Sequence, residues 1–335
     1  MAVTFRPSTI IRIETCASPT KKLRSIDSSA SSSPCVSPTA CPCASRSSPA
    51  ERLHAPRPPG PRCRPVGHRN LNTVLHITDL HLQPGENDRL LGVDTADSLR
   101  AVMTSAMAEA RPDALLVTGD ISHEGDVGSY QRFAAILADY YAGPMLCLPG
   151  NHDRAAAMQQ VLGDASALDL PGWLLIGLDS HVDGQVGAGL AETDMVSLRR
   201  ELAASGGRHV LIATHHPPVD VGCPWLDKDR IQNGAELLEW LSEHAGVKGM
   251  VFGHAHQVID SAHEHLALLG TPSTCFQFAP LTQSFAVDER KPGYRWLRLD
   301  AHGGVQTEVG RVDDYPLTLD LSERSRSAGR ATKPS

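Results

Sequence analysis

The sequence has no run of about 18 consecutive apolar residues, the approximate length that a membrane-spanning helix requires. It also lacks a secretory signal, because the stretch from Met1 to Ile13 is interrupted by polar residues such as Arg6 and Arg12. These two absences predict no transmembrane helix and no leader for export. We therefore expect a protein of the cytoplasm.

Paired cysteine spacings are missing from most of the chain. Five of the eight cysteines lie within residues 1–70, and the other three, Cys147, Cys223 and Cys275, are far apart in the sequence. Disulfides are rare in reducing compartments, where a buried free thiol packs like a small apolar side chain. The pattern predicts three reduced thiols with a packing role.

The chain beyond residue 70 also lacks an excess of positive charge. Residues 1–70 contain eleven Lys and Arg but only three acids, and the formal net charge of the whole chain is −7, so residues 71–335 carry −15. An acidic surface disfavours nucleic acid and anionic membranes, and we expect neither as a partner. A small phosphate ester stays compatible with this charge, because bound metal ions dominate the local field of a site.

Residues 1–70 are rich in Ser, Pro and Arg. Such a segment buries too little apolar area to offset its ordering entropy, so we predict a disordered tail. Three interpretations stay open: a flexible tail, an Arg- and Ser-rich transit peptide, or a start site assigned too far upstream, which is weakly favoured. A flexible C-terminal tail is predicted at residues 316–335.

Six apolar runs of strand length follow, and stretches with helical periodicity lie between them. The runs are residues 74–78, 114–118, 144–148, 173–178, 210–214 and 249–252. Nearly continuous apolar strands are typical of the buried sheets of α/β proteins. Helices are predicted at residues 95–110, where Asp94 and Asp97 suit the first turn, and at 234–245. The predicted fold class is α/β.

Five of these six runs lead into Asp, Asn or His. The residues are Asp79 and His81, then Asp120, then Asn151, His152 and Asp153, then His215 and His216, and finally His254 and His256. Ligands of α/β proteins gather beyond the carboxyl ends of the strands, so these five segments are expected to meet. Each motif alone is weak evidence for a metal site, since a pair such as Asp79-x-His81 usually lies in a solvated loop. The prediction depends on the combination of all five.

The residue types indicate transition metals. Carboxylate, amide and imidazole ligands suit Fe, Mn or Zn better than Ca or Mg, and the absence of thiolates argues against a structural zinc site. The number of candidate ligands exceeds the coordination number of one ion but fits two ions that share a carboxylate. Two such ions clamp a phosphoester and activate a water molecule. We therefore predict a dinuclear centre with iron and/or manganese, and zinc as an alternative.

The ordered motifs resemble those of the calcineurin-like metallophosphoesterases. The resemblance covers about residues 71–315 and implies a four-layer αββα sandwich. It implies that Asp79, His81, Asp120 and His256 hold the first ion, that Asp120 bridges, and that Asn151, His215 and His254 complete the second, with His216 as the alternative to His215. It further implies that His152 assists the leaving group, that Asp153 orients His152, and that His81, Asp120, Asn151, His152 and His256 contact the substrate.

Segments outside the metal motifs are similar to those of bacterial class III 3',5'-cyclic-AMP phosphodiesterases of the CpdA type. The segments are residues 90–93, 223–227, 271–278 and 292–296. This likeness implies hydrolysis of 3',5'-cyclic AMP to 5'-AMP by a metal-activated hydroxide. Trp225 and Phe276 are candidates for stacking on the purine or for packing, and Asn233 for helix capping or substrate contact.

Two further functions remain open. One is a broader phosphodiesterase or phosphomonoesterase that acts on glycerophosphodiesters or 2',3'-cyclic nucleotides. The other is a non-catalytic scaffold, which is disfavoured because all seven ligands and His152 are present. The sequence allows a monomer or a homodimer, and either cyclic AMP or cyclic GMP as the preferred nucleotide.

Overall fold

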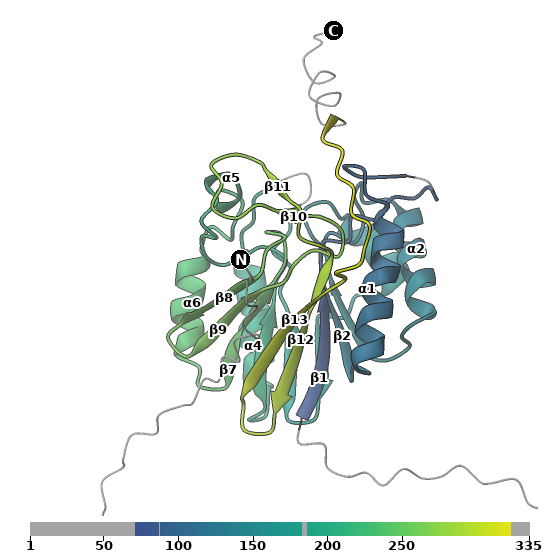
Figure 1. Cartoon of the computed structure of the whole chain (residues 1–335). Coiled ribbons are helices and arrows are strands. Elements are labelled where there is room, and N and C mark those ends of the chain that lie inside the picture. The colour runs from purple at the N-terminus through teal and green to yellow at the C-terminus, as the bar shows by residue number, and fades with distance from the viewer. Residues whose placement is uncertain (1–70, 87, 183–185, 323–335) are drawn as a thin grey trace, which may run out of the picture. The chain divides into compact units, whose positions relative to one another are not determined.

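The computed structural model describes residues 71–86, 88–182 and 186–322 (Figure 1). The predicted tail at residues 1–70 and the last part of the C-terminal tail, residues 323–335, lie outside the described residues. Two β-sheets with helices on their outer faces make up the described part, so the predicted α/β class is confirmed.

The first sheet has five strands in the order β13-β12-β1-β2-β3. They are β1 (Leu71–Ile77), β2 (Ala114–Thr118), β3 (Met145–Leu148), β12 (Gly293–Asp300) and β13 (Val305–Arg311). Strands β1, β2 and β3 are parallel, and β12 is antiparallel to β1. The carboxyl ends of β1, β2 and β3 therefore lie at one edge of this sheet.

The second sheet has six strands in the order β4-β5-β6-β7-β9-β8. They are β4 (Ala167–Leu170), β5 (Trp173–Gly177), β6 (His209–Ala213), β7 (Val247–Phe252), β8 (Ile259–His263) and β9 (Leu266–Gly270). Strands β5, β6, β7 and β9 are parallel, while β4 and β8 pair antiparallel at the two edges.

Helices connect most of the parallel strands, while β7 and β9 are connected through β8. The helices are α1 (Thr95–Glu109), α2 (Val127–Ala138), α3 (Ala155–Leu162), α4 (Glu192–Ala203), α5 (Pro224–Asp227) and α6 (Gly234–Ser242), and a short pair, β10 (Gln277–Phe278) and β11 (Val287–Asp288), completes the fold. The predicted cap of α1 is confirmed, since the Asp94 side chain accepts from the backbone N–H of Asp97; such a cap stabilises a helix by about 1 kcal/mol.

Three apolar cores separate four layers. One lies between the sheets and contains residues of both, such as Leu116 of β2 and Leu211 of β6. A second joins the first sheet to α1, α2 and α3, and a third joins the second sheet to α4 and α6. Figure 1 shows α1 and α2 on one side of the strands and α6 on the other. The predicted αββα sandwich is confirmed.

The packed part of the chain extends beyond the predicted boundary at residue 315. Leu317 and Leu319 pack against the core under α1, and the backbone N–H of Asp320 donates to the carbonyl oxygen of Leu91. Residues 317–320 thus contact the domain, within the stretch for which a flexible tail is predicted. No sequence pattern predicts this packing, because the segment has neither helical nor strand periodicity.

The described residues include no helix long and apolar enough to cross a membrane. Cys147, Cys223 and Cys275 are free thiols, two of them fully buried, as predicted.

Candidate metal centre

The seven predicted metal ligands come together from five strand ends and from both sheets. Asp79 and His81 follow β1, Asp120 follows β2, Asn151 follows β3, His215 follows β6, and His254 and His256 follow β7. Backbone hydrogen bonds hold the loops in register: the N–H of Asp79 donates to Gly119 O (3.0 Å) and that of His81 to Asp120 O (2.8 Å). The loops after β1 and β2 therefore act as a rigid extension of the sheet.

One half of the centre contains Asp79, His81 and His256, all of which are buried. The Nε2 atoms of His81 and His256 lie 3.1 Å apart. Nε2 of His256 is 3.4 Å from Asp79 Oδ1, and Nε2 of His81 is 3.5 Å from Asp120 Oδ2. Four potential ligand atoms thus surround a single point, which is the arrangement that one ion needs.

The other half contains Asn151, His215 and His254. Oδ1 of Asn151 lies 2.9 Å from Nδ1 of His254 and 3.1 Å from Nε2 of His215. Oδ1 of Asp120 is 3.5 Å from the same Nε2 of His215. The two oxygens of Asp120 therefore face different halves, so this carboxylate is placed to bridge them.

His216 lies next to His215 and His254, but both of its ring nitrogens form other hydrogen bonds. Its Nδ1 lies 2.9 Å from Ser180 Oγ, and its Nε2 lies 3.0 Å from the carbonyl oxygen of Val186. Both ring nitrogens of His216 are engaged, whereas Nε2 of His215 points to Asp120. The geometry favours His215 over its neighbour as a ligand.

The hydrogen bonds of the histidines show that the site fits metal ions. The Nδ1–H of His215 donates to Thr118 O, and that of His256 donates to Phe276 O, both at 2.7 Å. Because a carbonyl oxygen only accepts, each neutral ring turns an Nε2 lone pair toward the carboxylate and amide oxygens of the centre. Such lone pairs repel each other unless cations lie between them.

The ligand backbone is strained. Five of the seven ligands have positive φ, between 48° and 62°: Asp79, His81, Asp120, His254 and His256. Non-glycine residues rarely adopt this region, and such strain is concentrated at functional sites. Gly150 and Gly253 permit the close approach of the loops, since a Cβ on Gly150 would collide with Asp120 and one on Gly253 with Thr78.

Burial and mutual charge set the protonation of these groups. Burial lowers the pKa of His81 and His254 well below the usual range, and neighbouring histidines act in the same direction. Burial opposes ionisation of Asp79, but the charges of His256 and His215 lower its pKa overall. Burial opposes protonation of His215 as well, but the charges of Asp120 and Asp79 raise its pKa overall. Neutral imidazoles and ionised carboxylates are the forms that bind metals, so the shifts at His81, His254 and Asp79 favour ligation.

His152 stands beside the metal ligands, but its orientation has a different origin from the one predicted. Its Nδ1 donates to the backbone carbonyl oxygen of His123 at 2.9 Å. The Asp153 carboxylate instead accepts from the backbone N–H groups of Ile121, Ser122 and Gly150 and from the Tyr130 hydroxyl. The prediction that Asp153 orients His152 is therefore wrong; Asp153 fixes the loops after β2 and β3.

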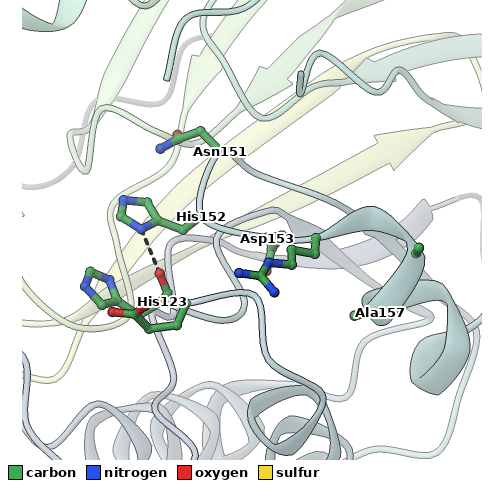
Figure 2. Close-up of a pocket in the computed structure, with 8 residues that line it drawn as sticks. His123, Asn151, His152, Asp153 and Ala157 are labelled. Carbon is green, nitrogen blue, oxygen red and sulfur yellow. Dashed lines mark hydrogen bonds between the residues drawn. The ribbon is translucent and has the colours of Figure 1, made fainter. Parts of the chain in front are cut away.

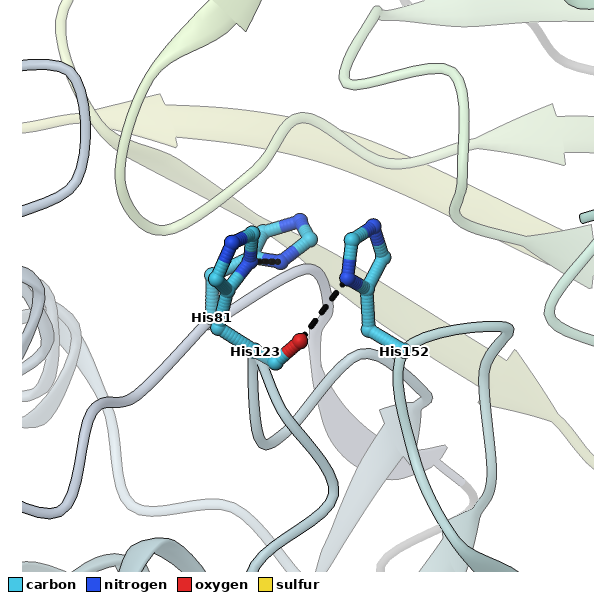
Figure 3. Close-up of side chains that lie close together, drawn as sticks. All are labelled: His81, His123 and His152. Atoms are coloured by element: carbon cyan, nitrogen blue, oxygen red, sulfur yellow. Dashed lines mark hydrogen bonds between the residues drawn. The ribbon is translucent and has the colours of Figure 1, made fainter. Parts of the chain in front are cut away.

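His123 is a neighbour that sequence reasoning missed. Its ring stacks on that of His152, with centroids 4.7 Å apart and planes 19° from parallel, and its Nδ1 lies 3.3 Å from Nδ1 of His81 (Figure 3). Burial and the charge of His152 lower the pKa of His123 to about 4. The available signal was a histidine three residues after Asp120, in a loop already assigned to the site.

A cavity of about 270 Å³ opens on the metal ligands and is walled by aromatic rings. Trp225, Phe278 and Phe285 line it and contact one another at centroid distances of 5.0–5.5 Å. Phe276, the other predicted stacking candidate, is buried against His81 and His256 and packs instead. Asn233 is the N-cap residue of α6, but its side chain bonds the backbone of Leu190, makes no capping hydrogen bond and does not line this cavity.

A second cavity, of about 570 Å³, lies along Asn151 and His152 and is shown in Figure 2. His123 and the first residues of α3, including Ala157, form its walls. Asn151 and His152 line both cavities, so these two residues stand where the cavities meet.

The αββα sandwich and the Asp, Asn and His cluster at its strand ends define a metallophosphoesterase. The chain belongs to the calcineurin-like phosphoesterase family, whose model matches residues 73–258.

Curated relatives are similar over most of their length. The 3',5'-cyclic adenosine monophosphate phosphodiesterase CpdA of Pseudomonas aeruginosa is 37% identical over 252 residues, which are 74% of this chain and 92% of the relative. The enzyme of the same name from Escherichia coli K12 is 38% identical over 256 residues, which are 74% of this chain and 93% of the relative.

Solved structures share the fold at low identity. A dimetal phosphatase from Danio rerio has a TM-score of 0.51 at 15% identity, covering 72% of this chain and 99% of its own. A purple acid phosphatase from yellow lupin has a TM-score of 0.53 at 12% identity, covering 76% of this chain and 55% of its own.

Proposed function

We propose that the protein hydrolyses 3',5'-cyclic AMP to 5'-AMP at this centre. The observation that carries the proposal is the convergence of seven ligand side chains beside His152 and an aromatic-walled cavity. Two relatives named for this activity align with this chain over 92% and 93% of their own lengths, at 37% and 38% identity. This similarity supports the choice of substrate.

The two halves of the centre would each hold one ion. Asp79, His81 and His256 would hold the first, Asn151, His215 and His254 would hold the second, and Asp120 would be shared between them. Iron and manganese suit this mixed oxygen and nitrogen set, with zinc as the alternative. When bound, the ions neutralise the charge on the phosphate and lower the pKa of a water molecule that serves as the nucleophile.

His152 protonates the leaving 3'-oxygen. Its Nδ1–H is committed to the His123 carbonyl oxygen, so the proton available for transfer is the one on Nε2. When that proton leaves, the neutral ring keeps the same Nδ1–H bond and does not need to turn. The backbone N–H of His152 donates to Asp120 Oδ1 at 2.9 Å, which fixes the distance between this acid and the metal ligands.

The nucleoside lies in the aromatic cavity. Trp225 is fixed by a hydrogen bond from its Nε1 to Thr282 Oγ1 (3.1 Å), so its ring offers a rigid face to a purine. Lys228 and Asp229 line the same cavity and supply a donor and an acceptor for the edge of the base. Stacking between aromatic rings with polar groups at the edge is a common mode of base recognition.

A substrate panel tests the proposal. The purified full chain with Mn²⁺ would be assayed on 3',5'-cyclic AMP, 3',5'-cyclic GMP, 2',3'-cyclic AMP, glycerophosphocholine and p-nitrophenyl phosphate, and bound metal would be measured in the same preparation. We expect 3',5'-cyclic AMP to have the highest kcat/KM. Cleavage of the other esters without it would indicate a broader phosphoesterase, and absence of both metal and turnover would indicate a scaffold.

A further inference from the structure

We infer that His123 is a positioning residue that orients both a metal ligand and the proton donor: its ring accepts a hydrogen bond from His81, and its backbone carbonyl accepts one from His152 (Figure 3). The second part rests on the proposed function, because it assigns His152 to the leaving group. The first part requires only that His81 binds a metal ion.

The side-chain contact follows from the tautomer of His81. Nε2 of His81 faces the ion position, 3.1 Å from His256 Nε2 and 3.5 Å from Asp120 Oδ2. An imidazole bound through Nε2 keeps its proton on Nδ1, and that N–H needs an acceptor. The atom in reach is Nδ1 of His123 at 3.3 Å, so His123 accepts there and carries its own proton on Nε2.

This arrangement differs from that of two other ligands. His215 and His256 donate their Nδ1–H groups to the carbonyl oxygens of Thr118 and Phe276. A backbone acceptor stays in place when a side chain is replaced, whereas the acceptor for His81 is a side chain. The orientation of His81 therefore depends on the identity of residue 123.

The backbone contact depends on how rigidly the loop is held. The N–H of His123 donates to Leu82 O at 3.0 Å, and Asp153 accepts from the N–H of Ser122 at 2.9 Å. The carbonyl oxygen of His123 is thus fixed in front of His152. The stacked ring of His123 adds a second restraint, because it lies 4.7 Å from the His152 ring in a nearly parallel plane.

A third metal ion among His81, His123 and His152 is the competing interpretation, since their nitrogens lie close together. It would require His81 to bind ions through both nitrogens, and Nδ1 of His152 is already engaged with a carbonyl oxygen. The hydrogen-bonded arrangement therefore accounts for all three rings without a further ion. Metal stoichiometry separates the two: more than two ions bound per chain would overturn the inference.

Two substitutions separate the acceptor from the stacked ring. In His123→Asn the amide Oδ1 replaces the accepting nitrogen, but the ring is lost. In His123→Phe the ring is kept, but the acceptor is lost. Metal-free full chain would be titrated with Mn²⁺ by calorimetry, without substrate. We expect His123→Phe to weaken binding of one of the two ions about 10- to 100-fold, and His123→Asn to weaken it clearly less. Equal effects of both variants, or none, would overturn the role of the ring nitrogen.

His302→Asn is the matched control. His302 is exposed in the turn between β12 and β13, beside the first residue of β1 and therefore at the end of the sheet opposite the centre. Its Mn²⁺ titration and thermal unfolding should match those of the unsubstituted chain. Thermal unfolding of the two His123 variants in EDTA separates a loss of metal affinity from a loss of folding.

Turnover tests the restraint on His152. 3',5'-cyclic AMP has a poor leaving group that needs protonation, whereas the p-nitrophenolate of bis(p-nitrophenyl) phosphate leaves without it. His123→Ala should lower kcat on the cyclic nucleotide more than on the aryl ester, and His123→Phe should preserve the ratio of the two. If His123→Ala and His123→Phe had the same ratio of kcat on the cyclic nucleotide to kcat on the aryl ester, stacking would not restrain His152. If the cyclic nucleotide is not cleaved at all, the proposed function fails while the metal titration still decides the role toward His81.

Discussion

The backbone N–H of His152 donates a 2.9 Å hydrogen bond to Oδ1 of Asp120. The other oxygen of Asp120 lies 3.5 Å from Nε2 of His81, on the side of the first ion. One carboxylate thus connects both halves of the metal centre and the segment that carries the proton donor. Changes at Asp120 and at His152 should therefore have different consequences.

Replacement of Asp120 removes the bridge. We expect Asp120→Ala to lose bound metal and to lower kcat by about a thousandfold or more, because metal ions supply several kcal/mol of transition-state stabilisation. Asp120→Asn keeps an acceptor for the N–H of His152 but loses the charge, so it should fold normally and bind metal weakly. Metal content by mass spectrometry and turnover of 3',5'-cyclic AMP are the measurements. Asp164→Ala, at an exposed position, is the control; full metal content and activity in Asp120→Ala would refute the dinuclear centre.

Replacement of His152 should spare the metals. His152→Ala removes the ring but not the backbone N–H that contacts Asp120. We expect two ions per chain and a kcat on 3',5'-cyclic AMP that falls about 100-fold or more, the usual contribution of a general acid. Turnover of bis(p-nitrophenyl) phosphate should fall much less, since its leaving group needs no proton. Unchanged turnover of the cyclic nucleotide would exclude a role in protonation.

The sequence was most informative where strands are buried on both faces. Runs such as Ala114–Thr118 are continuously apolar, and the structure places each of the six predicted runs in a strand within a few residues. The edge strands β8 and β13 were not predicted, because their exposed residues are polar and their sequences resemble loops. The buried strands β9 and β12 were not predicted either. Helices α2, α3 and α4 were missed as well, although α2 has an N-terminal cap at Asp126.

At the site, residue types and strand ends were predictable, but the partners of individual atoms were not. An Asp beside a His suggests that the carboxylate orients the ring, yet Asp153 bonds the backbone of two loops instead. The position of His123 follows from a bridge between Leu82 and Ser122, two residues from different loops that pair only in the folded domain. Such pairing leaves no periodic pattern in the sequence.

A chain that starts at Leu71 should be fully active. Strand β1 begins there and pairs with β12 from Leu71↔Asp300 onward, so every described ligand and core contact lies within the shortened chain. We expect the same kcat/KM and the same thermal midpoint as for residues 1–335, measured with equal Mn²⁺. A chain that starts at Val74, and so loses part of this pairing, should be less stable. Loss of activity in the chain from Leu71 would show that the preceding residues are needed.

Trp225 should affect substrate binding more than chemistry. Its ring lines the cavity next to the metal ligands, and stacking on a base contributes about 1–3 kcal/mol. Trp225→Ala should raise KM for 3',5'-cyclic AMP about tenfold, change kcat little, and leave bis(p-nitrophenyl) phosphate nearly unaffected. Trp240→Ala, on α6 and outside the cavity, is the matched control. Equal losses on both substrates would place the nucleoside elsewhere, with the cavity along Ala157 as the next position to test.

His76 should make the stability of the domain depend on pH. It is fully buried in β1, with Nε2 2.8 Å from Thr118 Oγ1 and Nδ1 2.7 Å from Thr271 Oγ1. Burial, and then the charge of Arg295, lower its pKa from 6.5 to about 3. Between these values the unfolded chain binds a proton that the folded chain does not. The contribution to stability is therefore complete above pH 6.5 and is lost as the pH falls toward 3.

Urea unfolding at pH 7.5 and pH 5.0 measures this effect. A group whose pKa falls from 6.5 to about 3 on folding loses about 2 kcal/mol of unfolding free energy between these two pH values. His76→Gln keeps hydrogen-bonding atoms for the two threonines but does not titrate, so its loss over the same interval should be smaller by about that amount. EDTA keeps both chains free of metal, so the ligand histidines contribute equally to the pH dependence of the unfolding free energy in both. His302→Gln should lose as much unfolding free energy between the two pH values as the unsubstituted chain. The same loss in His76→Gln would mean that the fold does not keep His76 neutral.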